Sequence, residues 1–240
     1  MRSISRAVVA LVAAAVPLTA LAAPAEAGKR HYQATLEPLN HSHGGGVVLI
    51  TLNGHVAHVR MGWRGLTDAP HLQQLRVGGR AKCPTLRSDV NHDGVVNTTE
   101  GARGYGDFAA ALTTDGTTGI NAVADLTKAP KGRSSTYVRK LKLSTAEATA
   151  LRSGKAAVIV EGLATAPLRA KARTETSDLS PSLKLPQTAP ALCGSFTATP
   201  KGAVKAGTGS TAGVDELGLL AGGAGLLAVG GVLLAARRRA

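Results

Sequence analysis

Two apolar segments, one at each end of the chain, limit how much of it can form a soluble fold. Residues 7–22 are apolar and follow Arg2 and Arg6, and Ala25-Glu26-Ala27 has the small-x-small pattern of a cleavage site. This arrangement predicts a secretory signal peptide over residues 1–27 and an exported mature chain. A retained N-terminal membrane helix is the alternative, which the short and proline-interrupted apolar run disfavours.

The C-terminal segment, residues 217–236, is an uncharged stretch of twenty residues followed by Arg237, Arg238 and Arg239. At a rise of about 1.5 Å per residue, a helix of this length spans a hydrocarbon core of about 30 Å. Arginines stay on the cytoplasmic side, so the preceding chain is expected outside. The sequence therefore predicts a single-pass cell membrane protein with a cytoplasmic basic tail at residues 237–240. A buried soluble helix is the alternative.

Between these ends, the sequence predicts one extracellular domain and a linker. Residues 200–216 are rich in Gly, Ala, Ser and Thr, which is typical of a flexible tether. Residues 28–199 are long enough for one ordinary core. Aromatic residues are only 2% of the chain, and Lys and Arg outnumber Asp and Glu by 28 to 15, for a net charge of +13. This composition excludes a multidomain enzyme, a disulfide-dense scaffold and a fully disordered chain, and the scarcity of aromatic stacking platforms argues against a nucleic-acid partner.

Several short segments have the pattern of β-strands. Residues 46–52 are β-branched and apolar, and Asn53-Gly54 after them is a strong hairpin signal. Residues 55–63 alternate between two faces, and the predicted core face carries Ala57, Val59, Met61 and Trp63. Residues 137–143 alternate in the same way, and residues 155–161 form a second apolar segment.

One short helix is predicted after these strands. Ser144 and Glu147 have the spacing of a capping box, and Ser153-Gly154 provides a C-terminal stop. Many short strands, a hairpin and one short helix favour an all-β fold, an antiparallel sandwich or Greek-key barrel, with the transmembrane helix added at the C-terminus.

The chain contains two cysteines, Cys83 and Cys193. An even pair in an exported protein predicts a disulfide, and closing a loop of this length stabilises a fold by about 4–5 kcal/mol in the chain-entropy treatment. Metal ligation and a reactive thiol are the alternatives, although neither cysteine lies in a CxxC pattern.

Residues 89–100 carry the most specific chemical pattern, Asp-Val-Asn-His-Asp-Gly-Val-Val-Asn-Thr-Thr-Glu. The segment matches the fixed positions of the twelve-residue calcium loop of EF-hands, with Gly94 at the required turn. Ca²⁺ takes six to eight oxygen ligands at about 2.3–2.6 Å, and this spacing wraps oxygens around one point. The predicted ligands are Asp89, Asn91, Asp93, the carbonyl of Val95, Asn97 (through water) and Glu100.

The surroundings of this loop predict a structural ion. Cys83-Pro84 before it and Gly101, Gly104 and Gly106 after it do not indicate the paired helices of a calcium sensor. Val96 is expected to pack the loop onto its domain. We expect a Ca²⁺ ion that pins a long surface loop, with a Kd on the order of 10⁻⁴–10⁻³ M. A metal-free turn rich in Asn, Asp and Gly is the alternative.

A series of blocks occurs in order within residues 31–196: Gly65-Leu66-Thr67-Asp68-Ala69-Pro70-His71, then Cys83-Pro84, the loop 89–100, Tyr105-Gly106 and Leu192-Cys193-Gly194. In this order the blocks resemble bacterial CHRD-domain proteins. The resemblance implies an all-β extracellular domain, often likened to the sandwich of copper/zinc superoxide dismutase.

The same resemblance implies a run His-x-x-His-x-His after the proline and a His-Gly in a later strand. Here only His71 of the run is present, and Gln74 and Arg76 occupy the positions of the other two histidines. Glu161-Gly162 occupies the position of the His-Gly pair in the later strand. An arginine does not ligate a metal, and its charge opposes metal binding. The expected function is therefore a non-catalytic calcium-binding surface module of unknown partner. The alternative is a degenerate or divergent copper/zinc superoxide-dismutase-like metalloenzyme.

Five further histidines lie toward the N-terminus, and a sixth lies at a non-ligand position of the calcium loop: His31, His41, His43, His55, His58 and His92. His41 and His43 have the spacing of two residues on one strand face, which a metal pair requires, but no neighbouring carboxylate or cysteine completes a ligand set.

Basic residues suggest the class of partner. Six basic residues could form a patch that faces anionic cell-envelope polymer or lipid head groups, or they could simply be solvated on a sheet face. These residues are Lys128, Lys131, Arg133, Arg139, Lys140 and Lys142. Another surface protein is also a candidate partner. Leu185-Pro186-Gln187-Thr188-Ala189 is similar to a sortase signal, but it has Ala in place of Gly and lies about 29 residues before the apolar helix. GxSxG, P-loop, GxGxxG and HExxH motifs are absent from the sequence.

Overall fold

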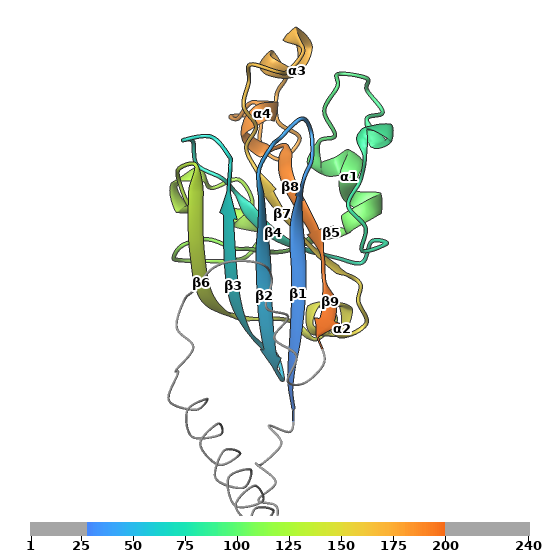
Figure 1. The fold of residues 1–240 in the computed structure, drawn as a ribbon, viewed down its shortest axis with the longest axis vertical. Coiled ribbons are helices and arrows are strands. Elements are labelled where there is room, and N and C mark those ends of the chain that lie inside the picture. Colours follow the sequence, from blue (N-terminus) through green and yellow to red (C-terminus); the bar gives the residue numbers. More distant parts are fainter. Residues whose placement is uncertain (1–27, 200–240) are drawn as a thin grey trace, which may run out of the picture. The chain divides into compact units, whose positions relative to one another are not determined.

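Strands dominate the computed structural model, which describes residues 28–199. They form one antiparallel sheet in the order β5-β4-β7-β8-β1-β2-β3-β6, with β9 paired to β1 (Figure 1). The strands are β1 (Lys29–Pro38), β2 (Gly45–Asn53), β3 (Val56–Arg64), β4 (Gln73–Val77), β5 (Asp107–Ala111), β6 (Ser134–Lys142), β7 (Ala156–Glu161), β8 (Pro190–Ser195) and β9 (Thr197–Thr199).

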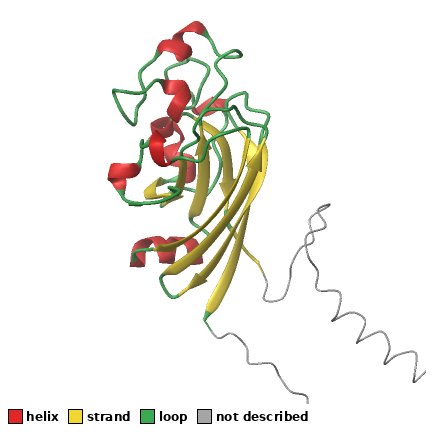
Figure 2. Cartoon of the chain, turned by 90° about the vertical axis from the view of Figure 1, so that its left-hand side faces the viewer, coloured by secondary structure: helices red, strands yellow, loops and turns green. Residues whose placement is uncertain are grey.

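Short helices connect the strands and gather on one side of the curled sheet (Figure 2). They are α1 (Thr98–Tyr105), α2 (Thr145–Arg152), α3 (Ala170–Thr174) and α4 (Leu185–Thr188), with 3₁₀ turns η1 (Leu86–Ser88), η2 (Ile120–Ala122) and η3 (Leu126–Lys128). Within residues 28–199, none of these helices has the length and hydropathy to cross a membrane. The predicted signal peptide 1–27, linker 200–216 and transmembrane helix 217–236 lie outside the described residues.

The β2–β3 hairpin confirms the prediction from alternation. Asn53 pairs with Val56 across the turn, where Gly54 adopts φ +58°. The buried face of β3 carries Ala57, Val59, Met61 and Trp63, as the pattern predicts. The alternation of β6 is confirmed too, because Tyr137 and Leu141 are buried while the residues between them are more exposed.

One hydrophobic core fills the inside of the curled sheet, where the two halves of the sheet face each other. It takes side chains from both, including Val48 and Ile50 of β2 and Val158 and Val160 of β7. A mostly-β antiparallel fold with few short helices is therefore confirmed, and its form is a half-barrel.

Strand β7 is buried along its whole length, because a second and smaller cluster covers its other face. Tyr105, at the end of α1, packs there with Ile159 and with the disulfide between Cys83 and Cys193. The predicted disulfide is thus present, with its two Cα atoms 5.7 Å apart and 110 positions between them. It anchors the segment that leads into the calcium-type loop.

Within residues 28–199 the structure contains three more α-helices than the single one predicted for this segment. The predicted helix is confirmed as α2, with the Ser144–Glu147 capping box. Helix α1 was missed because Gly101 and Gly104 are poor helix formers. Gly101 is nevertheless needed here, since a Cβ atom at this position would lie 2.3 Å from the Tyr105 hydroxyl.

Candidate functional site

The calcium-type loop lies between η1 and α1, at the end of the sheet that also carries α3 and α4 (Figure 1). Helix α1 begins at the tenth position of the loop, a helix that the glycines after the loop did not indicate. Asn97 caps α1, and its side-chain oxygen accepts a hydrogen bond from the Glu100 amide at 2.9 Å. The loop therefore has a helix on its C-terminal side and only a 3₁₀ turn on its N-terminal side.

Side-chain oxygens in the first half of the loop are held by main-chain amides further along it. Asp89 Oδ2 accepts from Gly94 N at 2.9 Å, Asn91 Oδ1 from Asp93 N at 3.0 Å, and Asp93 Oδ1 from Val95 N at 2.7 Å. Gly94 has φ +92°, a conformation that favours glycine. These bonds curl the loop around its own polar side chains.

Glu100 closes the loop from the twelfth position. Its Oε1 accepts from Val90 N at 2.9 Å and Asn91 N at 3.2 Å, and its Oε2 accepts from Asn97 N at 3.0 Å. Each carboxylate oxygen has two acceptor sites, so Oε1 is filled by these bonds and Oε2 keeps one site for a cation. Val96 is fully buried, as predicted, and packs the loop onto the domain.

Three carboxylate oxygens around this loop are buried and accept no hydrogen bond: Asp89 Oδ1, Asp93 Oδ2 and Glu175 Oε2. A buried carboxylate oxygen without a partner is costly, and the cost is removed by a bound cation. The side chain of Asp93 is 1% exposed, so bulk water does not solvate it. Carboxylate oxygens are the kind of ligand that a hard divalent cation prefers.

Glu175 is a carboxylate beside the loop that the sequence did not point to. It follows α3, far outside the twelve-residue pattern, and its Oε1 accepts from Asn91 Nδ2 at 3.1 Å. The pKa of its carboxyl is raised above the ordinary value, first by burial and then by the Asp93 carboxylate beside it. No motif links Glu175 to the loop, so only the fold could reveal it.

Within residues 28–199, no group of three or more His, Cys, Asp or Glu side chains is arranged as a ready metal centre. A calcium loop does not depend on charged side chains alone, because neutral oxygens supply half of its predicted ligands. Here these are the side-chain amide oxygens of Asn91 and Asn97 and the main-chain carbonyl of Val95.

A second polar cluster lies beneath α1 and gathers the four positions that the CHRD resemblance brought together. His71, Gln74 and Glu161 are fully buried and Arg76 is 5% exposed. Gln74 Nε2 donates to Glu161 Oε1 at 2.9 Å, and Arg76 Nη1 donates to Gln74 Oε1 at 2.7 Å. His71 Nδ1 lies 2.7 Å from the Glu161 main-chain oxygen and its Nε2 lies 3.0 Å from that of Thr67.

This cluster does not fit copper or zinc. Both ring nitrogens of His71 face carbonyl oxygens, so neither is turned to a shared ligand position. The Arg76 guanidinium lies 5.2 Å from the centre of the Tyr105 ring. Burial lowers the pKa of Arg76, and it raises that of the Glu161 carboxyl well above its ordinary value. The arrangement is a buried hydrogen-bond network around an arginine.

The turn after β1 lines a further pocket. His41 and His43 border it together with Arg133 and the segment 162–167, and its volume is about 690 Å³. No third metal-ligating side chain of the described domain joins them in a metal group. The pair therefore remains without a complete ligand set.

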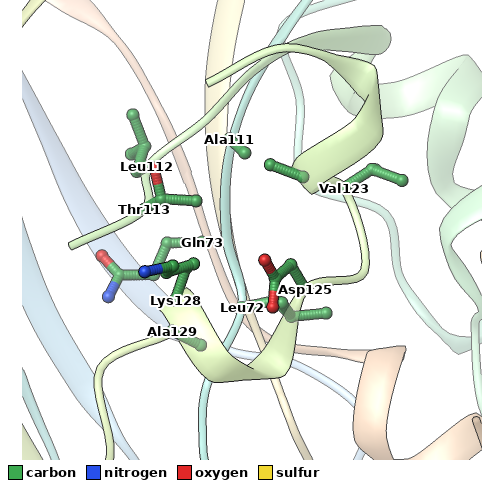
Figure 3. Close-up of a pocket in the computed structure, with 10 residues that line it drawn as sticks. Leu72, Gln73, Ala111, Leu112, Thr113, Val123, Asp125, Lys128 and Ala129 are labelled. Atoms are coloured by element: carbon green, nitrogen blue, oxygen red, sulfur yellow. The ribbon is translucent and has the colours of Figure 1, made fainter. Parts of the chain in front are cut away.

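A much smaller pocket of about 10 Å³ lies beside β4 and β5, room for about one water molecule (Figure 3). It is lined by Gln73, whose side-chain amide is buried and has neither of its polar atoms in a hydrogen bond. An ordered water is the simplest partner for such an amide. The pocket is too small for an organic ligand.

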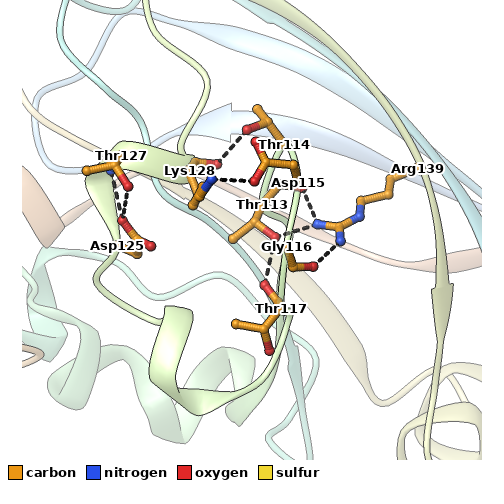
Figure 4. A network of polar contacts seen from close by, with 9 residues as sticks. All are labelled: Thr113, Thr114, Asp115, Gly116, Thr117, Asp125, Thr127, Lys128 and Arg139. Atoms are coloured by element: carbon orange, nitrogen blue, oxygen red, sulfur yellow. Dashed lines mark hydrogen bonds and ion pairs between the residues drawn. The ribbon is translucent and has the colours of Figure 1, made fainter.

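The six basic residues considered for a patch do not all lie on one face. Lys128 Nζ lies 2.5 Å from Asp115 Oδ1, and the Arg139 guanidinium donates to the main-chain oxygens of Thr113 and Gly116 (Figure 4). Arg139 and Lys140 point to opposite faces of β6. The outer face instead combines exposed cations and apolar side chains from three strands: Leu49, Arg60, Val138, Lys140 and Lys142.

The sortase-like segment forms α4, where Leu185, Pro186 and Thr188 are buried. Of its residues only Gln187 is exposed, and a helical, mostly buried segment is a poor peptidase substrate while the domain is folded. The structure therefore argues against sortase cleavage at residues 185–189.

Comparison of the chain with protein-family models, with curated proteins and with solved structures found no match in any of the three.

Proposed function

We propose that this protein is a calcium-binding structural module held at the cell surface. The observation that carries the proposal is the set of unpaired buried oxygens at the loop, Asp89 Oδ1 and Asp93 Oδ2, in a segment that matches the EF-hand loop pattern. Nothing in the loop favours a soft or borderline metal, because its ligands are all oxygens. The ion would pin residues 89–100 against the sheet.

We also propose that the domain is CHRD-like, and its mostly-β antiparallel fold is compatible with that resemblance. The antiparallel sheet encloses a single core, and the cysteine pair of the resemblance forms its disulfide. The domain would be exported by the signal peptide at 1–27 and anchored by the helix at 217–236. A disulfide is consistent with an oxidising compartment.

The proposed role is non-catalytic. Where the resemblance implies metal-ligating histidines, Gln74 instead accepts a hydrogen bond from Arg76 and donates one to Glu161. For partners, the exposed cations Arg60, Lys140 and Lys142 on the outer sheet face favour an anionic envelope polymer. Such binding is expected to weaken steeply with added salt, and retention on polymer columns at rising NaCl measures it.

A melting experiment tests the calcium proposal. The full-length protein is expected to melt at a higher temperature in calcium than in EGTA, and magnesium should give a smaller rise because it requires stricter octahedral geometry. Asp89→Ala should abolish the rise, while Asp115→Ala, outside the loop, should retain it. A calcium-dependent rise that persists in Asp89→Ala would place the ion elsewhere.

A further inference from the structure

We propose that Glu175 is a calcium ligand outside the twelve-residue loop, so that the ion joins residues 89–100 to residues 169–178. This inference rests on the proposed calcium site. It adds a ligand that the loop pattern does not contain, and with it a second segment of the chain whose order depends on the ion.

The first step is the position of the Glu175 side chain. Its Oε1 accepts a hydrogen bond from Asn91 Nδ2, at the third position of the loop, and its Oε2 is buried without a partner. Asn91 Oδ1 already accepts from Asp93 N. The Asn91 side chain therefore holds Glu175 to the loop while leaving one oxygen of Glu175 unpaired.

The second step is the relation between Glu175 and Asp93. The two carboxyls lie beside each other, Asp93 is almost completely buried, and its Oδ2 has no hydrogen-bond partner. Two carboxylates at such a position repel unless a proton or a cation lies between them. Because Oδ1 of Asp93 is held by Val95 N, the unpaired Oδ2 is the atom left for a cation.

The third step is what the nearby cationic side chains do. Lys171 Nζ donates to the main-chain oxygen of Asn91 at 3.0 Å, and Arg169 Nη1 donates to that of His92 at 3.2 Å. Both hydrogen bonds go to carbonyl oxygens, and neither satisfies the unpaired carboxylate oxygens. These two side chains tie the α3 segment to the loop, but they do not replace a cation at Asp93.

A further contact defines the end of the segment. Asp178 Oδ2 accepts from Thr99 N at 2.7 Å and from Thr99 Oγ1 at 2.8 Å, at the start of α1. Residues 169–178 thus contact the loop at its third, fourth and eleventh positions. With Glu175 as a ligand, the ion cross-links two segments that are distant in sequence.

Calorimetry on the full-length protein tests this inference with calcium chloride as the probe. We expect the wild type to bind one Ca²⁺ per chain, Asp89→Ala to lose binding, and Glu175→Gln to bind about tenfold more weakly or worse, because the site loses one charged ligand. The matched control is Glu147→Gln in α2, which retains its capping box and should bind as the wild type does.

Hydrogen exchange supplies a readout of the cross-link. Calcium should protect amides of residues 169–178 in the wild type and in Glu147→Gln but not in Glu175→Gln. In EGTA, Glu175→Gln should melt no lower than the wild type, because it removes one of two carboxylates that repel each other. This measurement distinguishes the loss of a calcium ligand from misfolding of the variant. Wild-type calcium affinity in Glu175→Gln would overturn this inference alone, whereas no calcium binding by the wild type would overturn the proposed function as well.

Discussion

Asn40 and Val96 are 56 positions apart, and the side-chain amide of Asn40 binds both main-chain polar groups of Val96. Asn40 Oδ1 accepts from Val96 N at 2.7 Å, and Nδ2 donates to the Val96 oxygen at 2.8 Å. The same nitrogen also donates to the Pro190 oxygen at 2.9 Å. Asn40 therefore docks the calcium-type loop onto the turn after β1 and onto the start of β8.

Asn40→Ala should destabilise the domain by about 2–4 kcal/mol, because it leaves the buried amide and carbonyl of Val96 without partners. The backbone of Asn40 has φ +53°, which Asn tolerates better than Ala, and this adds to the loss. Chemical denaturation measures the effect. Asn121→Ala, at an exposed position, is the control; equal stability of the two variants would contradict the docking role.

Glu161 should make stability depend on pH. Burial raises the pKa of its carboxyl, so the folded state binds the proton more tightly than the unfolded chain, whose glutamate pKa is about 4.3. This contribution is complete below that value and is lost as pH rises through the folded pKa. Glu161→Gln should therefore gain stability relative to the wild type as pH increases from about 4. Parallel stability curves for the two proteins from pH 4 to 8 would refute this assignment.

The Cys83–Cys193 disulfide should contribute about 4–5 kcal/mol to the free energy of unfolding, because it closes a loop of 110 positions in the unfolded chain. Replacing both cysteines with alanine should lower the denaturation midpoint accordingly. The denaturation midpoint of the double variant is compared with that of the reduced wild type. Both lack the cross-link, so a difference between them reports the packing of the cysteine side chains. A midpoint unaffected by either change would show that the cross-link does not constrain the unfolded chain.

Gly101→Ala should destabilise α1 by about 1–3 kcal/mol, although alanine is the better helix former. The added Cβ would lie 2.3 Å from the Tyr105 hydroxyl, and Tyr105 is fully buried under the second cluster. Gly119→Ala is the matched control, since its Cβ would come no closer than 3.7 Å to another atom. A stabilising Gly101→Ala would mean that Tyr105 has room to move.

Local features could be predicted from the sequence because their causes lie within a few residues. The Asn53-Gly54 turn, the alternation of β3 and the Ser144 capping box each depend on neighbouring side chains and on backbone sterics. Helix α1 is the local feature that the sequence did not predict. Gly101 lowers the helix propensity of this segment, but it is required there because Tyr105 packs against it.

The sequence alone determined the hairpin, the capped helix α2, the one possible cysteine pair and the spacing of oxygens in residues 89–100. Only the tertiary structure decided that Glu175 meets Asp93, that Asn40 holds Val96, and that Gln74, Arg76 and Glu161 form one buried network. The physical reason is the sequence separation of the residues that interact. Turns, alternation and loop spacing arise from adjacent residues, whereas the contacts of Glu175, Asn40 and Glu161 depend on which strands pair and which segments pack over them.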